Sequence, residues 1–420
     1  MREMKDSGIG WVHEIPIDWD VIRGKYLFTN DKMLVGAKVE EYERLALTMK
    51  GVVKRSKDDT EGLQPDKFNT YQILRTGELV FKLIDLQNIS TSRVGLSPYT
   101  GIVSPAYIIL KGNEQILPEY AEKYYLMMWM NQVFNALGDS GVRSSLNVGE
   151  LLELKLPVPP LEEQRRIADF LDNECGKIDS IIADVEKQIE ILEQYKRSVI
   201  FETVTKGLDH SVQMKDSGID YIGTIPECWT IEPLFIHFRE GKKKNVACKE
   251  ENLLSLSYGK VIRKDINSAE GLLPASFSSY NVVSEGDIII RPTDLQNDKR
   301  SLRTGLVKEK GIITSAYIDL IPFKGVNSRY YQYLLHVYDI VKTFYNMGNG
   351  VRQGLNYDEF SKLLVLSPPK QEQQAIADYL DKKCAEIDGV IADKKEQLDV
   401  LENYKKSLIY EYVTGKKEVV

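Results

Sequence analysis

Cysteine and histidine are scarce in this chain, and none of its apolar stretches is long. Four cysteines and four histidines occur among 420 residues. No two cysteines form a C-x-x-C pair and the histidines are scattered singly, so neither a disulfide framework nor a zinc site is expected. Tyr124–Met130 is about the longest apolar run, whereas a bilayer span needs ~20 residues. The N-terminal residues also lack the apolar core of a secretory signal, and we therefore expect a reduced, cytoplasmic protein.

The chain also lacks the short motifs by which most enzymes are identified. It contains no phosphate-binding loop of the form G-x-x-x-x-G-K-[ST], no G-x-G-x-x-G after a strand and no G-x-S-x-G turn. Pro65-Asp66 begins a nuclease pattern whose second half does not follow. Ser367–Lys370 resembles the Asn/Asp-Pro-Pro-aromatic turn of amino-methyltransferases, but lysine replaces the aromatic residue. We therefore expect no catalytic site in this chain.

The net charge is −7, and it is unevenly distributed. Residues 161–208 carry 7 basic and 11 acidic side chains, and residues 370–420 carry 9 and 11. The remaining segments, 1–160 and 209–369, are close to neutral. The acidity therefore belongs mostly to two segments and does not exclude nucleic-acid binding by the rest of the chain.

The chain contains one module twice, at an offset of about 209 residues. Met4–Trp19 recurs as Met214–Trp229, and Ile167–Thr205 matches Ile376–Thr414 at 21 of 39 positions. A repeat of this length is too long for a solenoid or propeller, so we interpret it as the tandem duplication of a two-part module.

The first part of each module, residues 1–160 and 209–369, is predicted to be a mixed α/β (α+β) globular domain. Helical periodicity with aromatic residues predicts core-packed helices over Glu119–Phe134 and Arg329–Phe344. Apolar stretches bounded by turn residues predict strands. These strands are Glu78–Leu83, Ile102–Val103, Ala106–Leu110, Asp287–Ile290, Ile312–Ile313 and Ala316–Ile321.

The second part of each module, residues 161–208 and 370–420, follows a proline cluster and is predicted to be one long helix. Apolar residues recur at alternating steps of four and three, which is a heptad seam, although Lys394 and Lys405 interrupt it. A ~40-residue helix is ~60 Å long and cannot bury such a seam alone. We therefore expect the two helices to pair as an antiparallel coiled coil, with Cys175 and Cys384 as small packing residues. The seam residues are Ile178, Ile182, Val185, Ile189, Leu192, Val199, Ile387, Ile391, Leu398, Leu401 and Leu408.

The whole chain resembles the specificity subunit of type I restriction–modification enzymes. The resemblance rests on the proline-rich entries into the long helices, Leu156–Asp172 and Leu366–Asp381, and on the loops GVRSSLN (Gly141–Asn147) and GVRQGLN (Gly350–Asn356). The strand starts GELVFK and GDIIIR add to it.

This resemblance implies two target recognition domains, each reading one half of a bipartite DNA site, and two helices that set the spacing between the half-sites. It also implies docking of two methyltransferase subunits, which bind S-adenosylmethionine and methylate adenine N6, and of an ATP- and Mg-dependent restriction subunit. The chain itself would bind no cofactor or metal. The assembled complex would be both a DNA methyltransferase and a type I site-specific endonuclease.

Two other interpretations remain open. The chain could be the recognition part of a single-chain methyltransferase–nuclease, although two closed modules ending at Val420 argue against it. It could also be a coiled-coil adaptor that displays two ligand-binding domains and does not bind DNA.

Basic residues that both copies share are candidates for DNA contact, since phosphate contacts position a protein and base contacts specify the sequence. Each set also has a structural interpretation, such as a clamp on a turn, a docking loop or a solvent-exposed turn. The sets are Arg143 with Asn147 and Arg352 with Asn356, two basic loops that contain Lys54, Arg55, Lys57, Arg263 and Lys264 with Arg55 equivalent to Arg263, and Arg93 with Arg303.

Residues that differ between the copies are candidates for reading bases. Ser144 corresponds to Gln353, whose amide can pair bidentately with adenine. Lys242, Lys243 and Lys244 have no counterpart in the first copy and are candidates for a backbone contact specific to the second domain. Because both domains are nearly neutral, the isolated chain should bind DNA weakly.

Overall fold

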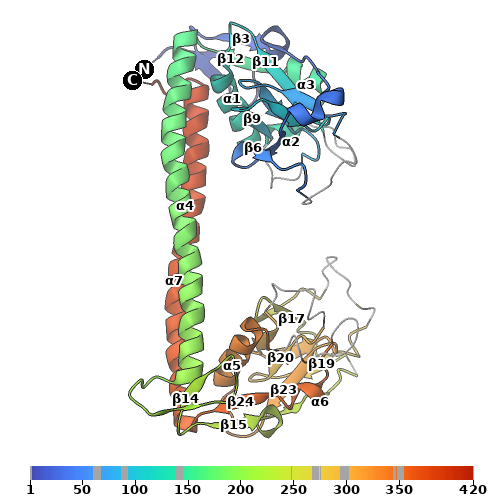
Figure 1. Ribbon diagram of the computed structural model, residues 1–420, viewed down its shortest axis with the longest axis vertical. Helices are drawn as coiled ribbons and strands as arrows, with labels where there is room; N and C mark the ends of the chain where they lie inside the picture. The colour runs from blue at the N-terminus through green and yellow to red at the C-terminus, as the bar shows by residue number, and fades with distance from the viewer. Residues whose placement is uncertain are drawn as a thin grey trace. The chain divides into compact units, whose positions relative to one another are not determined.

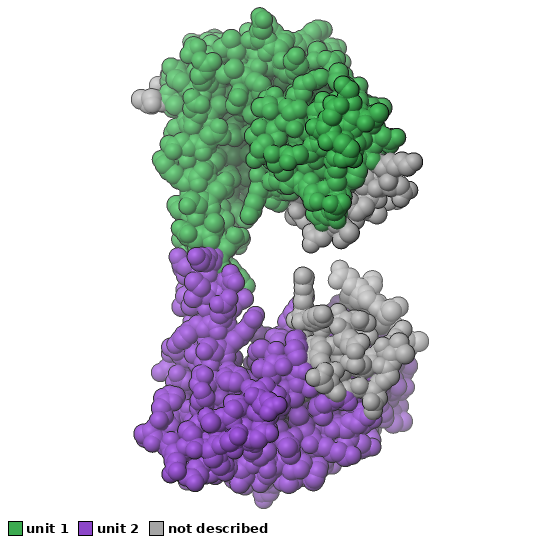
Figure 2. All heavy atoms as spheres, viewed as in Figure 1, with its two compact units in different colours: residues 1–186, 395–420 green, residues 187–394 purple. Residues whose placement is uncertain are grey.

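The computed structural model describes residues 2–59, 68–86, 93–137, 145–246, 248–266, 274, 276–293, 302–343, 347 and 354–419. It divides into two compact units (Figure 2). Unit 1 comprises Met1–Glu186 and Lys395–Val420, and unit 2 comprises Lys187–Lys394. Each unit therefore holds one globular domain and a part of each of the two long helices.

The domain of unit 1 is built on two four-stranded sheets (Figure 1). The sheet β4-β11-β8-β9 is antiparallel throughout, and the sheet β6-β5-β10-β7 is antiparallel except between β5 and β10. β1 pairs with β2 and β3 with β12. The bounds are β1 (Met4–Asp6), β2 (Glu14–Pro16), β3 (Asp20–Arg23), β4 (Phe28–Thr29), β5 (Arg44–Thr48), β6 (Gly51–Arg55), β7 (Gln72–Leu74), β8 (Leu79–Phe81), β9 (Val94–Leu96), β10 (Gly101–Val103), β11 (Ile108–Gly112), β12 (Lys155–Val158), η1 (Gly24–Tyr26), η2 (Gly36–Glu41), α1 (Pro118–Met130), α2 (Val133–Leu137) and α3 (Val148–Glu153).

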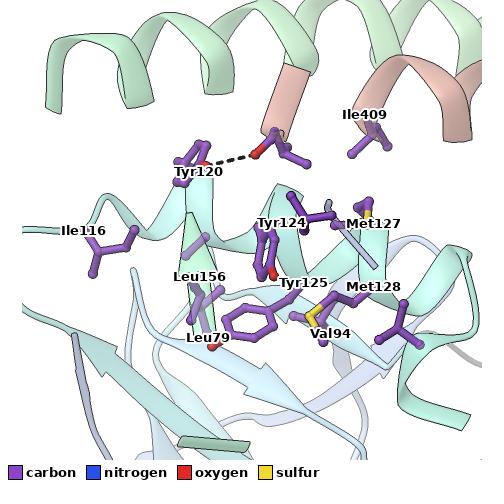
Figure 3. Packing of buried hydrophobic residues seen from close by; sticks show 14 of the residues in the cluster. Leu79, Val94, Ile116, Tyr120, Tyr124, Tyr125, Met127, Met128, Leu156 and Ile409 are labelled. Atoms are coloured by element: carbon purple, nitrogen blue, oxygen red, sulfur yellow. Dashed lines mark hydrogen bonds between the residues drawn. The ribbon is translucent and has the colours of Figure 1, made fainter. Parts of the chain in front are cut away.

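The core of unit 1 forms where α1 packs between the β4-β11-β8-β9 sheet and the long helices (Figure 3). Tyr120, Tyr124 and Tyr125 of α1 are fully buried there, as their periodicity predicted. Tyr120 donates its hydroxyl hydrogen towards the carbonyl oxygens of Pro157 and Val413, at 2.9 and 3.1 Å, and thereby satisfies a polar group that burial would otherwise leave unpaired. Ile409 and Val413 belong to this core, so the end of the chain completes the domain with which the chain begins.

Unit 2 repeats this architecture. The sheet β16-β23-β20-β21 has the connectivity of β4-β11-β8-β9, and β15 pairs with β24 as β3 pairs with β12. β13 pairs with β14, β17 with β18 and β19 with β22. The bounds are β13 (Met214–Asp216), β14 (Thr224–Pro226), β15 (Thr230–Pro233), β16 (Phe238–Glu240), β17 (Leu254–Ser257), β18 (Lys260–Arg263), β19 (Asn281–Val283), β20 (Ile288–Ile290), β21 (Thr304–Leu306), β22 (Gly311–Ile313), β23 (Ile318–Pro322), β24 (Leu364–Ser367), η3 (Leu234–Ile236), α5 (Ser328–Ile340) and α6 (Tyr357–Phe360).

Two long helices, α4 (Leu161–Lys206) and α7 (Lys370–Val413), follow the domains. Each helix starts directly after two prolines. Proline is tolerated at the start of a helix but not in its interior. α4 is followed by Gly207 at φ +78°, and Gly415 at φ +69° lies just beyond α7. These positive φ values lie in the left-handed region that glycine adopts at helix ends.

Within each unit the two helices pair antiparallel. In unit 1, Lys405 Nζ donates to both carboxylate oxygens of Asp179, at 2.5 and 2.7 Å. In unit 2, Lys196 Nζ donates to both oxygens of Asp388, each at 2.7 Å. The seam residues inferred from the heptad pattern are all buried or half-buried, while most of their neighbours are exposed. The fold class expected from the sequence, duplicated α/β domains with coiled-coil helices, is confirmed.

The observed elements differ from the sequence-based expectation at two helices. The helix expected over Arg329–Phe344 ends at Ile340, and Lys342 adopts φ +64° just beyond it. The helix expected over Glu119–Phe134 ends at Met130, and the short α2 follows it. Gln132 adopts φ +56° between them, a left-handed conformation that an α-helix cannot continue. The predicted strands are all present, and their ends shift by no more than two residues.

Among the described residues, no helix is long and apolar enough to cross a membrane. The same residues hold no cluster of three or more His, Cys, Asp or Glu side chains suited to a metal ion. Cys175 and Cys384 are unbridged and buried, and burial raises the pKa of both thiols. They pack against the cores of units 1 and 2.

Candidate nucleic-acid interface

The two basic segments taken as loops are strands of β-hairpins. β6 and β18 each pair antiparallel with the preceding strand, β5 or β17. In the first hairpin Leu45 faces Lys54, and in the second Leu254 faces Arg263. Since Leu45 and Leu254 are equivalent, Lys54 is the counterpart of Arg263, and the equivalence of Arg55 with Arg263 inferred from the sequence is wrong by one residue. In a strand this shift moves a side chain to the other face of the sheet.

The basic side chains of these hairpins have acidic neighbours. Lys54 Nζ lies 2.5 Å from a Glu43 carboxylate oxygen, and this hydrogen bond raises the pKa of Lys54. Arg263 bonds Glu309 through two guanidinium nitrogens, which raises the pKa of the arginine. Each pair is exposed, so contact with a phosphate would require only the exchange of one anionic partner for another.

Arg55 and Lys57 are held closer to the domain surface. Arg55 Nε bonds Asp59 at 2.5 Å, and Lys57 Nζ donates to the carbonyl oxygen of Val39 at 2.7 Å and to Glu40 at 3.1 Å. Lys264, which corresponds to Arg55 in the corrected alignment, is exposed.

Arg93 and Arg303 do not lie on the surface where the DNA-contact interpretation places them. Their exposed fractions are 1% and 0%. Arg93 donates to the carbonyl oxygens of Lys82, Ile84 and Asp85, and Arg303 to those of Arg291 and Thr293. Burial lowers the pKa of Arg93. Each arginine therefore holds the backbone at the end of a central strand, β8 or β20, and its role is structural.

Asn147 and Asn356 cap helices. The Asn147 carboxamide oxygen accepts from the Glu150 backbone N–H at 3.0 Å, and the Glu150 carboxylate accepts from the Asn147 N–H at 2.7 Å. Asn356 and Glu359 form the same capping box at the start of α6. This is a structural role in place of the DNA contact considered for these residues. Their loop partners Arg143, Ser144, Arg352 and Gln353 lie outside the described residues.

Lys242, Lys243 and Lys244 follow β16 and are all exposed. Lys242 forms an ion pair with Glu240 at 2.6 Å, which raises the pKa of the lysine. Lys244 donates to the side-chain oxygen of Asn281 at 2.8 Å. In unit 1 the corresponding bridge to β7 is made by Leu34, which makes Lys32, Met33 and Leu34 the counterparts of Lys242, Lys243 and Lys244. Lys242 therefore has a counterpart in the first copy, contrary to the expectation from the sequence, and only Lys243 and Lys244 replace apolar residues.

The structure adds exposed apolar residues that the sequence analysis missed. Met49 and Tyr258 occupy equivalent positions in the turns of the two hairpins and are 60% and 77% exposed. Val246 and Ile262 are also exposed in unit 2. A large apolar residue inside a predicted turn, beside basic residues, was the signal that could have identified them, because base stacking uses such side chains.

Comparison with known proteins then identifies the chain's relatives. A family model for the type I restriction modification DNA specificity domain matches residues 44–192. The full chain is 25% identical, over 465 aligned residues covering 97% of that protein, to a protein assigned as the specificity subunit of the type I restriction enzyme MjaX of Methanocaldococcus jannaschii. The specificity subunit of the type I restriction enzyme MjaVIII from the same organism is 26% identical over 63% of each chain. The chain is therefore similar along its whole length to type I restriction–modification specificity subunits.

A solved structure supports the fold of this chain. A chain from a study of complex assembly and conformational transition in a type I R-M system superposes with a TM-score of 0.69, covering 96% of this chain and 99% of that chain at 14% identity. The basic residues considered for DNA contact separate into two groups by their exposure. Arg93 and Arg303 are buried, whereas Lys54, Arg263 and Lys242 to Lys244 are exposed on the domains.

Proposed function

We propose that this chain is the specificity subunit of a type I restriction–modification enzyme, the component that reads the DNA sequence. Each of its domains reads one half of a bipartite DNA site. The supporting observation is that the two domains share a scaffold and differ in what they expose. The buried arginines, the capping asparagines and one four-stranded sheet, β4-β11-β8-β9 or β16-β23-β20-β21, are common to both units. Shared interiors with different surfaces are what two readers of unlike sequences require.

The differences lie on one set of elements in each domain. The hairpin turn carries Met49 in unit 1 and Tyr258 in unit 2. Lys54 is replaced by Arg263, whose planar guanidinium can recognise guanine bidentately, whereas a lysine is a point charge. The loop that follows β16 adds Lys243 and Lys244, whose counterparts in unit 1 are Met33 and Leu34. We assign these hairpins and loops, together with Arg143 and Arg352, to DNA.

The long helices are proposed to fix the spacing between the half-sites and to dock two methyltransferase subunits. The chemistry then belongs to the partners: methylation of adenine N6 with S-adenosylmethionine by the methyltransferase, and cleavage by an ATP- and Mg-dependent restriction subunit.

Sequencing the host genome for N6-methyladenine tests this proposal. We expect one asymmetric motif with two separated halves, which disappears when this chain is deleted and returns when it is supplied. Exchange of residues 248–266 for the equivalent unit 1 segment should change one half of the motif and leave the other intact. A methylated motif without two halves, or methylation that does not depend on this chain, would favour the adaptor interpretation.

A further inference from the structure

Unit 2 has a cavity where its globular domain meets the start of α7. The cavity has a volume of about 690 Å³ and is lined by the first residues of α5 and α7, the end of β21 and the turn that carries Glu285. A second cavity of about 370 Å³ adjoins it, and Gly325, Val326, Lys370 and Gln373 line both. Small-molecule sites in proteins have volumes of about 300–1,000 Å³, so the larger cavity has room for a ligand of nucleotide size.

Basic side chains outnumber acidic ones in the lining of the larger cavity. The basic residues are Lys308, Arg329 and Lys370, and the acidic residue is Glu285. Arg329 is held by Asp378 and Asp381, at 2.7 and 2.5 Å. Lys308 and Lys370 are exposed, and neither forms an ion pair with a described residue. The two lysines therefore bring positive charge to the cavity that the described part of the chain does not neutralise.

The start of α5 adds hydrogen-bond donors to the same cavity. The Asn327 side-chain oxygen accepts from the backbone N–H groups of Arg329 and Tyr330, at 3.1 and 3.3 Å. The N–H and the hydroxyl of Ser328, the first residue of the helix, have no partner among the described residues. The positive end of the helix dipole also lies here, and both features favour an anion.

A buried amide in the cavity wall has fewer backbone hydrogen bonds than its counterpart. In unit 1, Gln164 forms three bonds of 2.8, 2.8 and 2.9 Å with backbone groups, two of them just before α1. Gln373 occupies the equivalent position in unit 2 and is 5% exposed. It keeps one of these three bonds, to the carbonyl oxygen of Pro368, and bonds the Tyr331 side chain. Because an amide has two donor hydrogens and two acceptor positions, Gln373 retains bonding capacity at the cavity wall.

The duplication does not preserve the character of this site. The unit 1 counterparts of Lys308, Arg329 and Lys370 are Pro98, Glu119 and Leu161. Gly325, at φ +89°, replaces Gln115, and a Cβ atom at Gly325 would lie 2.9 Å from Lys370 Nζ. The glycine therefore leaves the space that the lysine ammonium occupies. The basic cavity is a property of unit 2 and not of the scaffold that both units share.

We propose that this cavity binds a nucleotide, whose phosphate is held by Lys308, Lys370 and the start of α5. Lysine ammonium groups and helix starts are common phosphate ligands in proteins. Leu306, Val307 and Val326 supply an apolar wall for the uncharged part of the ligand. The site lies apart from the hairpins and loops assigned to DNA and so goes beyond the proposed function. The DNA backbone is the other source of the same phosphate chemistry, and the test separates the two.

Isothermal titration calorimetry of the full chain at low salt tests the site, with AMP as the probe. AMP should bind at least about tenfold more tightly than adenosine or inorganic phosphate, because each of these lacks one part of the contact. Lys308→Gln and Lys370→Leu, which places the unit 1 residue in unit 2, should each weaken AMP binding about tenfold. Lys324→Gln is the matched control, since Lys324 is an exposed lysine beside Gly325 that does not line either cavity. It should bind AMP as the wild type does.

The melting temperature of each variant should match that of the wild type, because the substituted lysines are exposed. A folded wild-type chain that does not bind millimolar AMP, or AMP binding that survives both substitutions, would overturn the site. Equal affinities for AMP and inorganic phosphate would overturn the nucleotide assignment.

DNA binding by the assembled complex identifies the source of the phosphate. Lys370→Leu should leave the slope of log affinity against log salt unchanged. A slope reduced by about 1 would show that the cavity holds a DNA phosphate and would overturn the assignment to a free nucleotide. Each of these outcomes leaves the reading of DNA by the hairpins and loops intact, so the two proposals fail separately.

Discussion

Lys196 on α4 donates to both carboxylate oxygens of Asp388 on α7, each at 2.7 Å. The duplication makes this the same ion pair as that between Lys405 and Asp179, with the helices exchanged. The lysines occupy seam positions and are mostly buried along their stems, while the aspartates are more exposed. The seam lysine of each unit is therefore ion-paired. Lys405, which interrupts the apolar heptad pattern, has Asp179 as its partner.

Removing either side of this pair should have opposite effects on stability. Asp388→Asn leaves the Lys196 ammonium without its anion and should lower the free energy of unfolding by about 1 kcal/mol. Lys196→Leu completes the apolar seam and should raise it by about 1 kcal/mol. Urea denaturation followed by circular dichroism measures both, and equal destabilisation by the two variants would contradict this account. Asp399→Asn, on an exposed part of α7, serves as the control.

Asp319 should make the stability of unit 2 depend on pH. Its carboxyl group is 1% exposed, and within the described part of the chain neither carboxylate oxygen has a hydrogen-bond partner. Burial, and then the nearby Asp287, raises the pKa of Asp319 to about 8. Asp287 itself is buried and its pKa is raised in the same direction. Arg239 opposes the shift and Glu240 adds to it.

The sign follows from the raised pKa in the folded state. The stabilising contribution of protonated Asp319 is fully present below the unfolded value of 3.8 and is lost as pH rises towards about 8. The unfolding free energy of unit 2 should therefore fall between pH 5 and pH 8. In unit 1 the equivalent position, opposite Val80, is held by Ile109. Asp319→Ile should raise the melting temperature at pH 8 more than at pH 5, and an equal shift at both would contradict the assignment.

Arg303 and Arg93 should affect stability without making phosphate contacts. The planar guanidinium of Arg303 donates to several carbonyl oxygens at once, and a lysine ammonium at this position cannot. Arg303→Lys should therefore lower the free energy of unfolding by about 2 kcal/mol. DNA affinity of the assembled complex would fall with the folded fraction. The slope of log affinity against log salt should stay unchanged, whereas loss of a phosphate contact reduces it by about 1. A reduced slope for Arg303→Lys would restore the DNA-contact interpretation.

Lys243 and the two loop arginines are expected to behave in the opposite way. Lys243→Gln, Arg143→Glu and Arg352→Glu should each weaken DNA binding by the assembled complex and leave the melting temperature within about 1 °C. Lys243→Gln should also reduce the salt slope by about 1. Lys382→Gln, an exposed lysine on α7, is the matched control and should change neither. If neither arginine variant weakened binding, their loops would be reassigned to docking or structure.

The spacing of apolar residues predicted the strands and the burial of the helices that contain Tyr120 and Tyr330, because the residues of a buried face recur at a regular interval in the sequence. The capping boxes were also readable: Asn147 and Asn356 are each followed three residues later by glutamate, which is the signature of a helix start. Arg93 and Arg303 were not readable in this way. Whether an arginine bonds the backbone carbonyls of a neighbouring strand depends on where that strand ends in three dimensions. The local sequence around such a buried arginine does not differ from that around an exposed one. The equivalence of Lys54 with Arg263 followed only from the strand pairing, in which Leu45 faces Lys54 and Leu254 faces Arg263.

The position of α7's last turns has a consequence during synthesis. The core of unit 1 contains Leu408, Ile409 and Val413, and the Tyr410 hydroxyl donates to the carbonyl oxygen of Val12. The domain that leaves the ribosome first therefore lacks part of its interior until the last residues emerge, whereas residues 187–394 already form a complete unit. The second domain can finish folding while the first waits, and a nascent chain arrested shortly before Leu408 would expose apolar surface of its N-terminal half to chaperones and proteases.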